Sequence, residues 1–298
     1  MQRSCRLGGP QVLSSKLIGA REVGVWSTLI VSVAFWANIV RASPGHAPSL
    51  HDAIANVLDN GAVDVLAWIW VFVRAGEMYA AKPASRLQIW ATFLAGAIVL
   101  APLRLATGLA LIILGVCLLR ERQALQAARH VGLVFLALAF ETVWASSLMQ
   151  PLHVLVGSMD ANISALLLRL LGTDAIVHAN TVDNISANFT ICIWPACTSS
   201  SPLAAVSLLF IVVALLRGES PRRSHLPWLG GSLIASILLT EVRLVLLAMN
   251  ESSYNWWHTG PGLTIYTMVA LVPAVIFPIL ATSDHKMAGA LPLNRLVA

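Results

Sequence analysis

The sequence predicts an all-α integral membrane protein with about eight membrane-spanning helices. Of its 298 residues, 57% are hydrophobic and only 11% are charged, and the mean hydropathy is +0.77. Soluble globular proteins carry about 25% charged residues. The apolar residues also form separate runs of the length that a membrane span needs, which is about 20 residues.

Eight apolar runs are predicted to be spans. They cover residues 23–40, 57–73, 87–102, 104–119, 131–149, 202–216, 226–249 and 262–281. The third and fourth runs are short and are joined only by a few residues around Pro102. The N-terminal segment, residues 1–22, is basic and lacks a small-residue cleavage site, so we expect the first run to stay in place as a helix.

Lys and Arg residues are distributed unevenly between alternate connections. If residues 1–22 and the tail, residues 282–298, lie inside, fifteen of the 19 Lys and Arg residues are inside, and Arg243 is within a span; the outer ones are Arg41, Arg104 and Arg169. Cytoplasmic loops of membrane proteins are enriched in Lys and Arg, so both termini are predicted to be cytoplasmic. The net charge of +5 has the same explanation and gives no reason to expect a nucleic-acid partner.

One predicted outer connection, residues 150–201, is far longer than the others. It separates a five-span part, residues 23–149, from a three-span part, residues 202–281. It includes an amphipathic stretch, Ala161–Leu171, which we expect to be a helix, and a polar stretch rich in Asn, Thr and Ser from 173 to 190. Long ordered loops often carry function, so reactive residues are expected on this side.

Cys197, at the end of this connection, is the candidate nucleophile. The hydroxyl-rich residues after it lead to Pro202, a pattern that predicts a helix start with a serine as N-cap. A helix N-terminus favours the thiolate form of a nearby cysteine. Two alternatives remain: Cys197 is a small buried apolar residue, as we expect for Cys5 and Cys117, or a disulfide with Cys192 blocks the thiol.

Two more candidates lie on the same predicted side. Arg243 is in the outer part of the seventh span, and because an arginine at the centre of a span costs about 2.5–3.5 kcal/mol, we expect it to be functional or paired; the alternative is an arginine that reaches the outer surface. His258 follows Trp256 and Trp257, and is either a proton carrier or an interfacial histidine. The other histidines lack metal-ligand spacing, so neither a metal nor another cofactor is expected.

The order of these three residues resembles that of the exosortase/archaeosortase family of integral-membrane cysteine transpeptidases. The matching stretches are ACTSSSPLAAVSLLF with Cys197, LLTEVRLVLLAMN with Arg243 and WWHTGPGLTIYTMV with His258. The proline and amphipathic segment after Met149 also look like the family. The resemblance covers about residues 130–282.

Two of the matching stretches depart from the family pattern. The family has Cys-Ser-Gly where this chain has Thr198 and Ser199 after the cysteine, and it usually has Asn three residues before the arginine, where this chain has Thr240. These three residues, with Gly260 after the histidine, are expected to support the site or to bind substrate.

The resemblance implies a prokaryotic plasma-membrane enzyme with an extracytoplasmic active site. The Cys197 thiolate would attack a peptide carbonyl to form a thioester, His258 would act as general base and acid, and Arg243 would hold the oxyanion or the substrate backbone. Substrates would be exported proteins with a C-terminal sorting tail of the PEP-CTERM type, which has a short motif such as Pro-Glu-Pro, a hydrophobic helix and a basic cluster. The acceptor, a lipid or a glycan, is left open.

Two other functions remain open at this point. One is a multi-span transporter or membrane scaffold whose Arg243 binds an anion and whose Cys197 has no role. The other is a membrane protease that uses water as the acceptor. The single long connection leading to one cysteine, without an acidic or broken-helix pathway through the spans, favours an enzyme over a transporter.

Overall fold

The computed structural model describes residues 63–75, 85–99, 101, 104–120 and 126–290. The chain divides into two compact units, Met1–Leu136 and Ala137–Ala298. The predicted first span, the N-terminal segment 1–22 and Cys5 lie outside the described residues, as does the end of the predicted tail.

The first unit contains apolar helices at the positions of the predicted second to fifth spans. These are a helix over residues 63–75, α3 Arg86–Val99, α4 Arg104–Arg120 and α5 Gln126–Val143, which continues into the second unit. α4 and α5 approach closely at two glycines: a Cβ on Gly115 or on Gly132 would meet the other residue's carbonyl oxygen at 2.9 Å. Small residues at such contacts are typical of helix packing in membranes.

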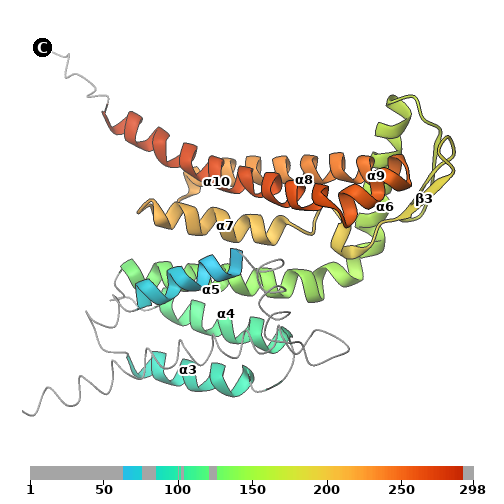
Figure 1. The fold of residues 1–298 in the computed structure, drawn as a ribbon. Helices are drawn as coiled ribbons and strands as arrows, with labels where there is room; N and C mark the ends of the chain where they lie inside the picture. Colours follow the sequence, from blue (N-terminus) through green and yellow to red (C-terminus); the bar gives the residue numbers. More distant parts are fainter. Residues whose placement is uncertain (1–62, 76–84, 100, 102–103, 121–125, 291–298) are drawn as a thin grey trace, which may run out of the picture. The chain divides into compact units, whose positions relative to one another are not determined.

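The second unit contains five α-helices (Figure 1). They are α6 Met149–Leu170, α7 Leu203–Leu216, α8 Leu226–Met249, α9 Glu251–His258 and α10 Pro261–Ala290. A π-helical segment, η1 Trp144–Leu148, joins α5 to α6, and short 3₁₀ turns precede two of the others: η2 Pro195–Cys197 before α7 and η3 Arg223–His225 before α8. The sixth and seventh predicted spans therefore match α7 and α8 to within one residue.

Among the residues that the structure describes, three segments are long and apolar enough to cross a membrane: α6, residues 223–249 and residues 261–283. α3, α4 and α7 are apolar but shorter. α7, at 14 residues, is about 21 Å long, against a hydrocarbon thickness of about 30 Å. These helices support a membrane protein, whereas the eight-span arrangement and its orientation stay predictions.

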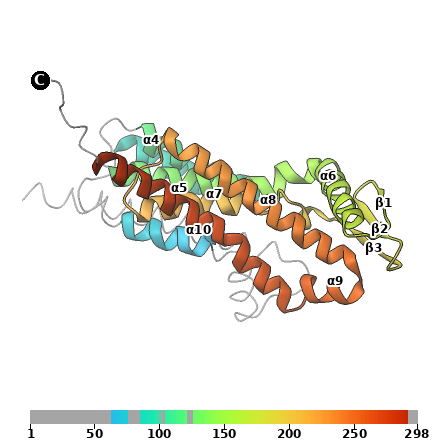
Figure 2. The same ribbon diagram turned by 90° about the horizontal axis from the view of Figure 1, so that it is seen from above.

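α8 and α10 run side by side in both views (Figures 1 and 2). Their contact is close at Gly231 of α8, where a Cβ would lie 2.6 Å from the ring of Phe277 in α10. α7 packs against both helices and buries eight of its 14 residues. A helix that is apolar on all sides, as α7 is, needs such enclosure by its neighbours or by lipid.

A three-stranded antiparallel sheet follows α6, so the all-α prediction was wrong for this segment. Its strands are β1 Ala175–His178, β2 Thr181–Asn184 and β3 Phe189–Cys192, in the order β1-β2-β3. Val182 pairs with Val177 on one side and with Ile191 on the other. Ala179 and Asn188, in the two connections, adopt positive φ angles of 55° and 47°. A strand is recognised in a sequence by alternating apolar and polar residues. Strands of only four residues in a polar stretch are too short for this alternation to be recognised.

The sheet packs between α6 and the last turns of α8. The buried cluster consists of Ala161, Ala165 and Leu168 from α6, Ala175, Val182, Ile191 and Ile193 from the sheet segment, and Leu244, Val245, Leu247 and Ala248 from α8. Asn184, which is 2% exposed, donates hydrogen bonds to the carbonyls of Ala248 and Met249 at 3.1 and 2.9 Å. Its amide therefore satisfies carbonyl groups that the end of a helix leaves unpaired.

α6 differs from the prediction in length and in course. The expected amphipathic helix covered Ala161–Leu171, whereas α6 begins at Met149, directly after the π-helical segment η1, and contains Pro151. α6 has the length and composition of a membrane span, yet it runs across the end of α8 and not beside it (Figures 1 and 2). The predicted boundary at residue 150 therefore falls inside a continuous helix.

α9 was not anticipated, although the sequence contains its start signal. The Asn250 side chain accepts a hydrogen bond from the Ser253 N–H at 2.9 Å, which is an N-cap interaction. Glu251 occupies the first turn, where a negative charge is favourable. The stretch with Trp256 and Trp257 is thus part of a helix that ends at His258.

Candidate active site

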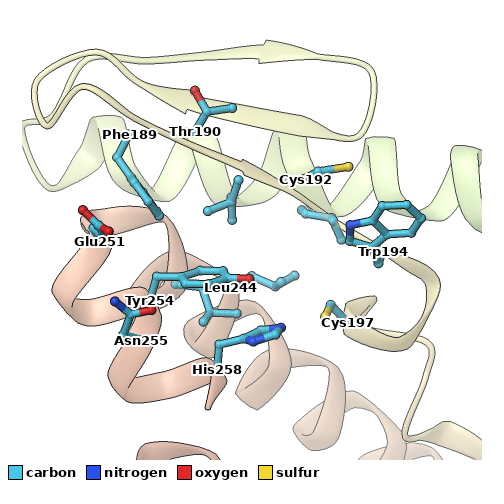
Figure 3. Close-up of a pocket in the computed structure, with 13 residues that line it drawn as sticks. Phe189, Thr190, Cys192, Trp194, Cys197, Leu244, Glu251, Tyr254, Asn255 and His258 are labelled. Atoms are coloured by element: carbon cyan, nitrogen blue, oxygen red, sulfur yellow. The ribbon is translucent and has the colours of Figure 1, made fainter. Parts of the chain in front are cut away.

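A pocket of about 360 Å³ lies between β3, the residues that follow it, and the α8–α9 corner. Cys197 and His258 both line this pocket, together with Tyr254 of α9 and Leu244 of α8. In Figure 3 the His258 ring and the Cys197 sulfur point toward one another. The structure therefore brings together two of the three predicted catalytic side chains in one cavity.

Cys197 lies at the end of η2 and is half-buried. Its N–H donates to the Trp194 carbonyl at 2.8 Å. The prediction of a serine-capped helix start was wrong: α7 begins at Leu203, its N-cap position is Pro202, and no side chain caps it. A helix N-terminus stabilises a nearby negative charge only within about the first turn of the helix. Cys197 lies before that turn, so α7 does little to favour its thiolate form.

The three cysteines that the structure describes have different surroundings. Cys117 is buried, as predicted, and Cys192 and Cys197 are free thiols, so they form no disulfide in this structure. Cys192 is exposed on β3 and lines the same pocket. Cys197 is therefore available for chemistry.

Burial and charge act in opposite directions on the Cys197 thiol. Burial has the larger effect and raises its pKa above the ordinary value, while the Arg243 guanidinium lowers it; Cys192 adds to the rise, and the hydrogen bond to the Trp194 backbone reduces it. The net direction is upward, so the resting side chain is mainly a neutral thiol at neutral pH. A base near the sulfur is needed to generate the nucleophile.

The residues after Cys197 are held by hydrogen bonds to surrounding elements. The Thr198 hydroxyl donates to the Pro195 carbonyl at 2.9 Å. The Ser200 hydroxyl contacts the Met149 sulfur at 3.0 Å, and the Trp144 indole N–H donates to the Ser200 carbonyl at 2.9 Å. Thr198, predicted as a substrate-binding or supporting residue, is 2% exposed and does not line the pocket, so its geometry suits support.

Ser199 makes two hydrogen bonds to a residue that the sequence analysis did not identify. Its N–H and hydroxyl donate to the two carboxylate oxygens of Asp160 in α6, at 2.8 and 2.7 Å. Asp160 is 2% exposed, and Glu241 of α8, 4% exposed, lies beside it. Asp160 lies one residue before the predicted amphipathic helix, Ala161–Leu171, and an acidic residue at that border was the signal that could have identified it, because a buried carboxylate needs donors.

Arg243 lies behind the pocket and is 8% exposed. Its guanidinium stacks on the Tyr266 ring of α10, 4.5 Å from the centroid, and its Nε donates to the Trp257 carbonyl at 3.4 Å. The Tyr266 hydroxyl is 2.8 Å from the Thr240 hydroxyl. An arginine buried on an aromatic ring is not one that extends to the surface. Thr240 thus supports the ring on which Arg243 lies.

His258 is the last residue of α9 and is partly exposed. Its imidazole stacks on Tyr254, with ring centroids 4.7 Å apart and an interplanar angle of 11°. Gly260, predicted as a supporting residue, lies in the turn to α10, where a Cβ would be 2.8 Å from the Trp256 carbonyl oxygen. Glycine there allows α10 to begin close to α9, which fixes the position of His258.

Comparison with known proteins gives one match. The family model described as transmembrane exosortase matches residues 59–275, which is most of the chain and includes all three candidate catalytic residues. No curated protein and no solved structure shows significant similarity to the chain.

Removing the positive charge of Arg243 should slow alkylation of Cys197. We expect Arg243→Gln to raise the pKa of the thiol further, so that less thiolate is present at pH 8 and iodoacetamide reacts more slowly. Arg243→Lys keeps a charge and should stay closer to the wild type. Peptide mass spectrometry over a pH series separates Cys197 from Cys192; identical pH profiles for the two variants would contradict this explanation.

Removing the Asp160 carboxylate should destabilise the segment that carries Cys197. Asp160→Ala leaves a buried N–H and hydroxyl of Ser199 without their acceptor, at a cost of about 1–3 kcal/mol. Thermal unfolding in detergent measures the loss. Ser164→Ala is the matched control, because it removes a buried hydroxyl one turn along α6 without touching Ser199; an equal loss in both variants would argue against a specific role of Asp160.

Proposed function

Because the chain belongs to the transmembrane exosortase family, we propose that it is a membrane-embedded cysteine transpeptidase that removes C-terminal sorting tails through a Cys197 thioester. The observation that carries this proposal is the pairing of Cys197 and His258 across one pocket. Membership of the family supports sorting-signal proteins as the kind of substrate.

His258 activates the thiol in this mechanism. The Cys197 pKa is raised, so the S–H proton must leave before attack, and an imidazole accepts protons near neutral pH. The sulfur then attacks the peptide carbonyl, and a tetrahedral intermediate forms. Its collapse breaks the C–N bond, the proton on His258 passes to the departing amine, and the thioester remains. An acceptor amine, hydroxyl or water then attacks the thioester and restores the thiol.

Arg243 stabilises negative charge in this mechanism. The backbone N–H groups of Cys197 and Ser199 already donate to Trp194 and Asp160, so they are not available for an oxyanion. Among the described residues, no group accepts a hydrogen bond from the terminal amino groups of Arg243. Its charge already acts on the thiol, and a fixed cation in a partly buried site is suited to the oxyanion that develops in the same place.

A tail substrate suits the position of the pocket. The pocket lies at the end of α8 and next to the segment that leads into α7, two helices at predicted span positions. A polypeptide that leaves the membrane beside these helices passes the sulfur with its extramembrane residues. We propose that the cleaved bond lies in those residues, just before the hydrophobic part of the tail.

Cys197→Ala should abolish tail removal from a co-expressed protein that carries a Pro-Glu-Pro motif, a hydrophobic segment and an arginine cluster, because no thioester can form. Immunoblots follow the tail, and the product mass distinguishes transfer from hydrolysis. Cys192→Ala, which removes the other thiol of the pocket, should retain processing. Equal processing by wild type and Cys197→Ala, at equal abundance, would exclude the nucleophile and favour a transporter or scaffold.

His258→Gln should lower the rate of tail removal by about 10²-fold or more, the range of a general acid–base contribution. The residual activity should rise with pH, because hydroxide replaces the lost base in forming the thiolate. His178→Gln is the control, since the His178 side chain is 72% exposed and lies outside the pocket. The test is to measure initial rates of tail removal from about pH 6 to 9, a range that brackets the ordinary pKa of imidazole.

A further inference from the structure

The pocket runs along one edge of β3. Six consecutive residues, 189–194, line it. Side chains of a strand alternate between the two faces of its sheet, so a hollow that lay on one face would touch only every second residue. Contact with all six means that the pocket follows the strand's edge and its backbone.

The strand register shows which backbone groups face the pocket edge. The Ile193 N–H donates to the Asn180 carbonyl at 2.8 Å, and Val182 pairs with Ile191. Hydrogen-bonded and non-hydrogen-bonded pairs alternate along an antiparallel ladder. Ile193 and Ile191 therefore direct their backbone groups toward β2, and Thr190 and Cys192 direct theirs away from the sheet.

These outward groups have the properties of an open strand edge. β3 is the last strand in the order β1-β2-β3, and Thr190 and Cys192 are both exposed. In the part of the chain that the structure describes, no hydrogen bond reaches the backbone N–H or C=O of either residue. β3 contains no proline, no lysine and no other charged residue. Proteins commonly use such residues to protect a strand edge from the addition of another strand.

We propose that an extended segment of the substrate polypeptide adds to β3 as a fourth strand, pairing with Thr190 and Cys192 and passing its cleaved bond to Cys197. This inference rests on the proposed function and specifies how that site holds its substrate. The occupant is a polypeptide because the edge offers main-chain donors and acceptors, and it is the substrate because the same pocket contains the sulfur five residues beyond the strand. Main-chain pairing of this kind provides affinity, while side-chain pockets provide selectivity.

Selectivity then depends on the wall opposite β3. Leu244 and Leu247 of α8 and Tyr254 of α9 form an apolar surface there. In an added strand, alternate side chains face this wall. We therefore expect apolar or proline side chains at every second position of the bound segment. A proline at such a position is compatible with pairing when its missing N–H would point away from β3.

Thr190→Pro tests the backbone contact directly. It removes an N–H that the β2–β3 ladder does not use, so the sheet and the melting temperature should be preserved, as proline is tolerated on edge strands. Loss of the donor and obstruction of the added strand should lower kcat/KM for tail removal about tenfold or more, mainly through KM. Thr190→Ala changes the side chain only and keeps the backbone N–H, so it should lower kcat/KM by clearly less than Thr190→Pro does. Equal kinetics in the two variants would overturn the inference.

Photo-cross-linking tests the same contact without catalysis. Benzoylphenylalanine placed at Thr190 in the Cys197→Ala protein should cross-link the tailed protein described above through residues near its Pro-Glu-Pro motif. Placed at Ile176, which is 46% exposed on β1 at the other side of the sheet, it should not. Absence of cross-links from position 190, or cross-links only to a second copy of this chain, would overturn the inference.

These outcomes are separable from failure of the proposed function. If wild type removes the tail, Cys197→Ala does not, and Thr190→Pro behaves like Thr190→Ala, then the enzyme is a cysteine transpeptidase that does not use β3 in this way. If position 190 cross-links the tailed protein but Cys197→Ala still processes it, the edge binds the polypeptide and the nucleophile assignment fails.

Discussion

The Asp160 carboxylate, buried in α6, accepts two hydrogen bonds from Ser199 and so ties the segment that carries Cys197 to a long helix. Residues 193–202 form a connection made of one short 3₁₀ turn, a bend and turns, so side-chain contacts such as this one fix its position. A nucleophile must be held in a defined geometry to react efficiently. Burying a carboxylate is costly unless its oxygens find donors, so the same pair of bonds both satisfies Asp160 and places the sulfur.

The site is assembled from elements that are fixed to one another by similar buried polar contacts. Asn184 attaches the sheet to the end of α8, and Tyr266 of α10 supports Arg243 of α8. Tyr254 holds the ring of His258 by stacking. The three candidate catalytic residues come from three different elements: α10 supports Arg243, the Ser199–Asp160 hydrogen bonds hold the segment of Cys197, and Tyr254 of the same helix, α9, orients His258.

The sequence was informative where a property is local and uninformative where it depends on contacts between distant segments. The bounds of α7 and the start of α8 could be predicted because one apolar run lies between Pro202 and Arg217 and the next begins at Leu226. The choice of Cys197, Arg243 and His258 followed from residue type, predicted topology and family order. In contrast, Asp160 meets Ser199 across 39 residues, and Asn184 meets Ala248 across 64. Such partners are selected by tertiary packing, and single-residue patterns do not reveal them. The sheet was missed for a related reason, since its strands are stabilised by α6 and α8 more than by their own composition.

Burial of the thiol has consequences for both its resting state and its reaction. It raises the pKa of Cys197, which keeps most of the side chain protonated and less reactive toward small electrophiles when no substrate is bound. It also lowers the local dielectric, so that the charge of Arg243 acts more strongly on the sulfur than it would in water. An activated thiolate then requires both the cation and a base within reach, and the pocket provides His258 for the second requirement. The raised pKa is therefore consistent with a nucleophile that is generated at the moment of attack and is not maintained in advance by a helix terminus.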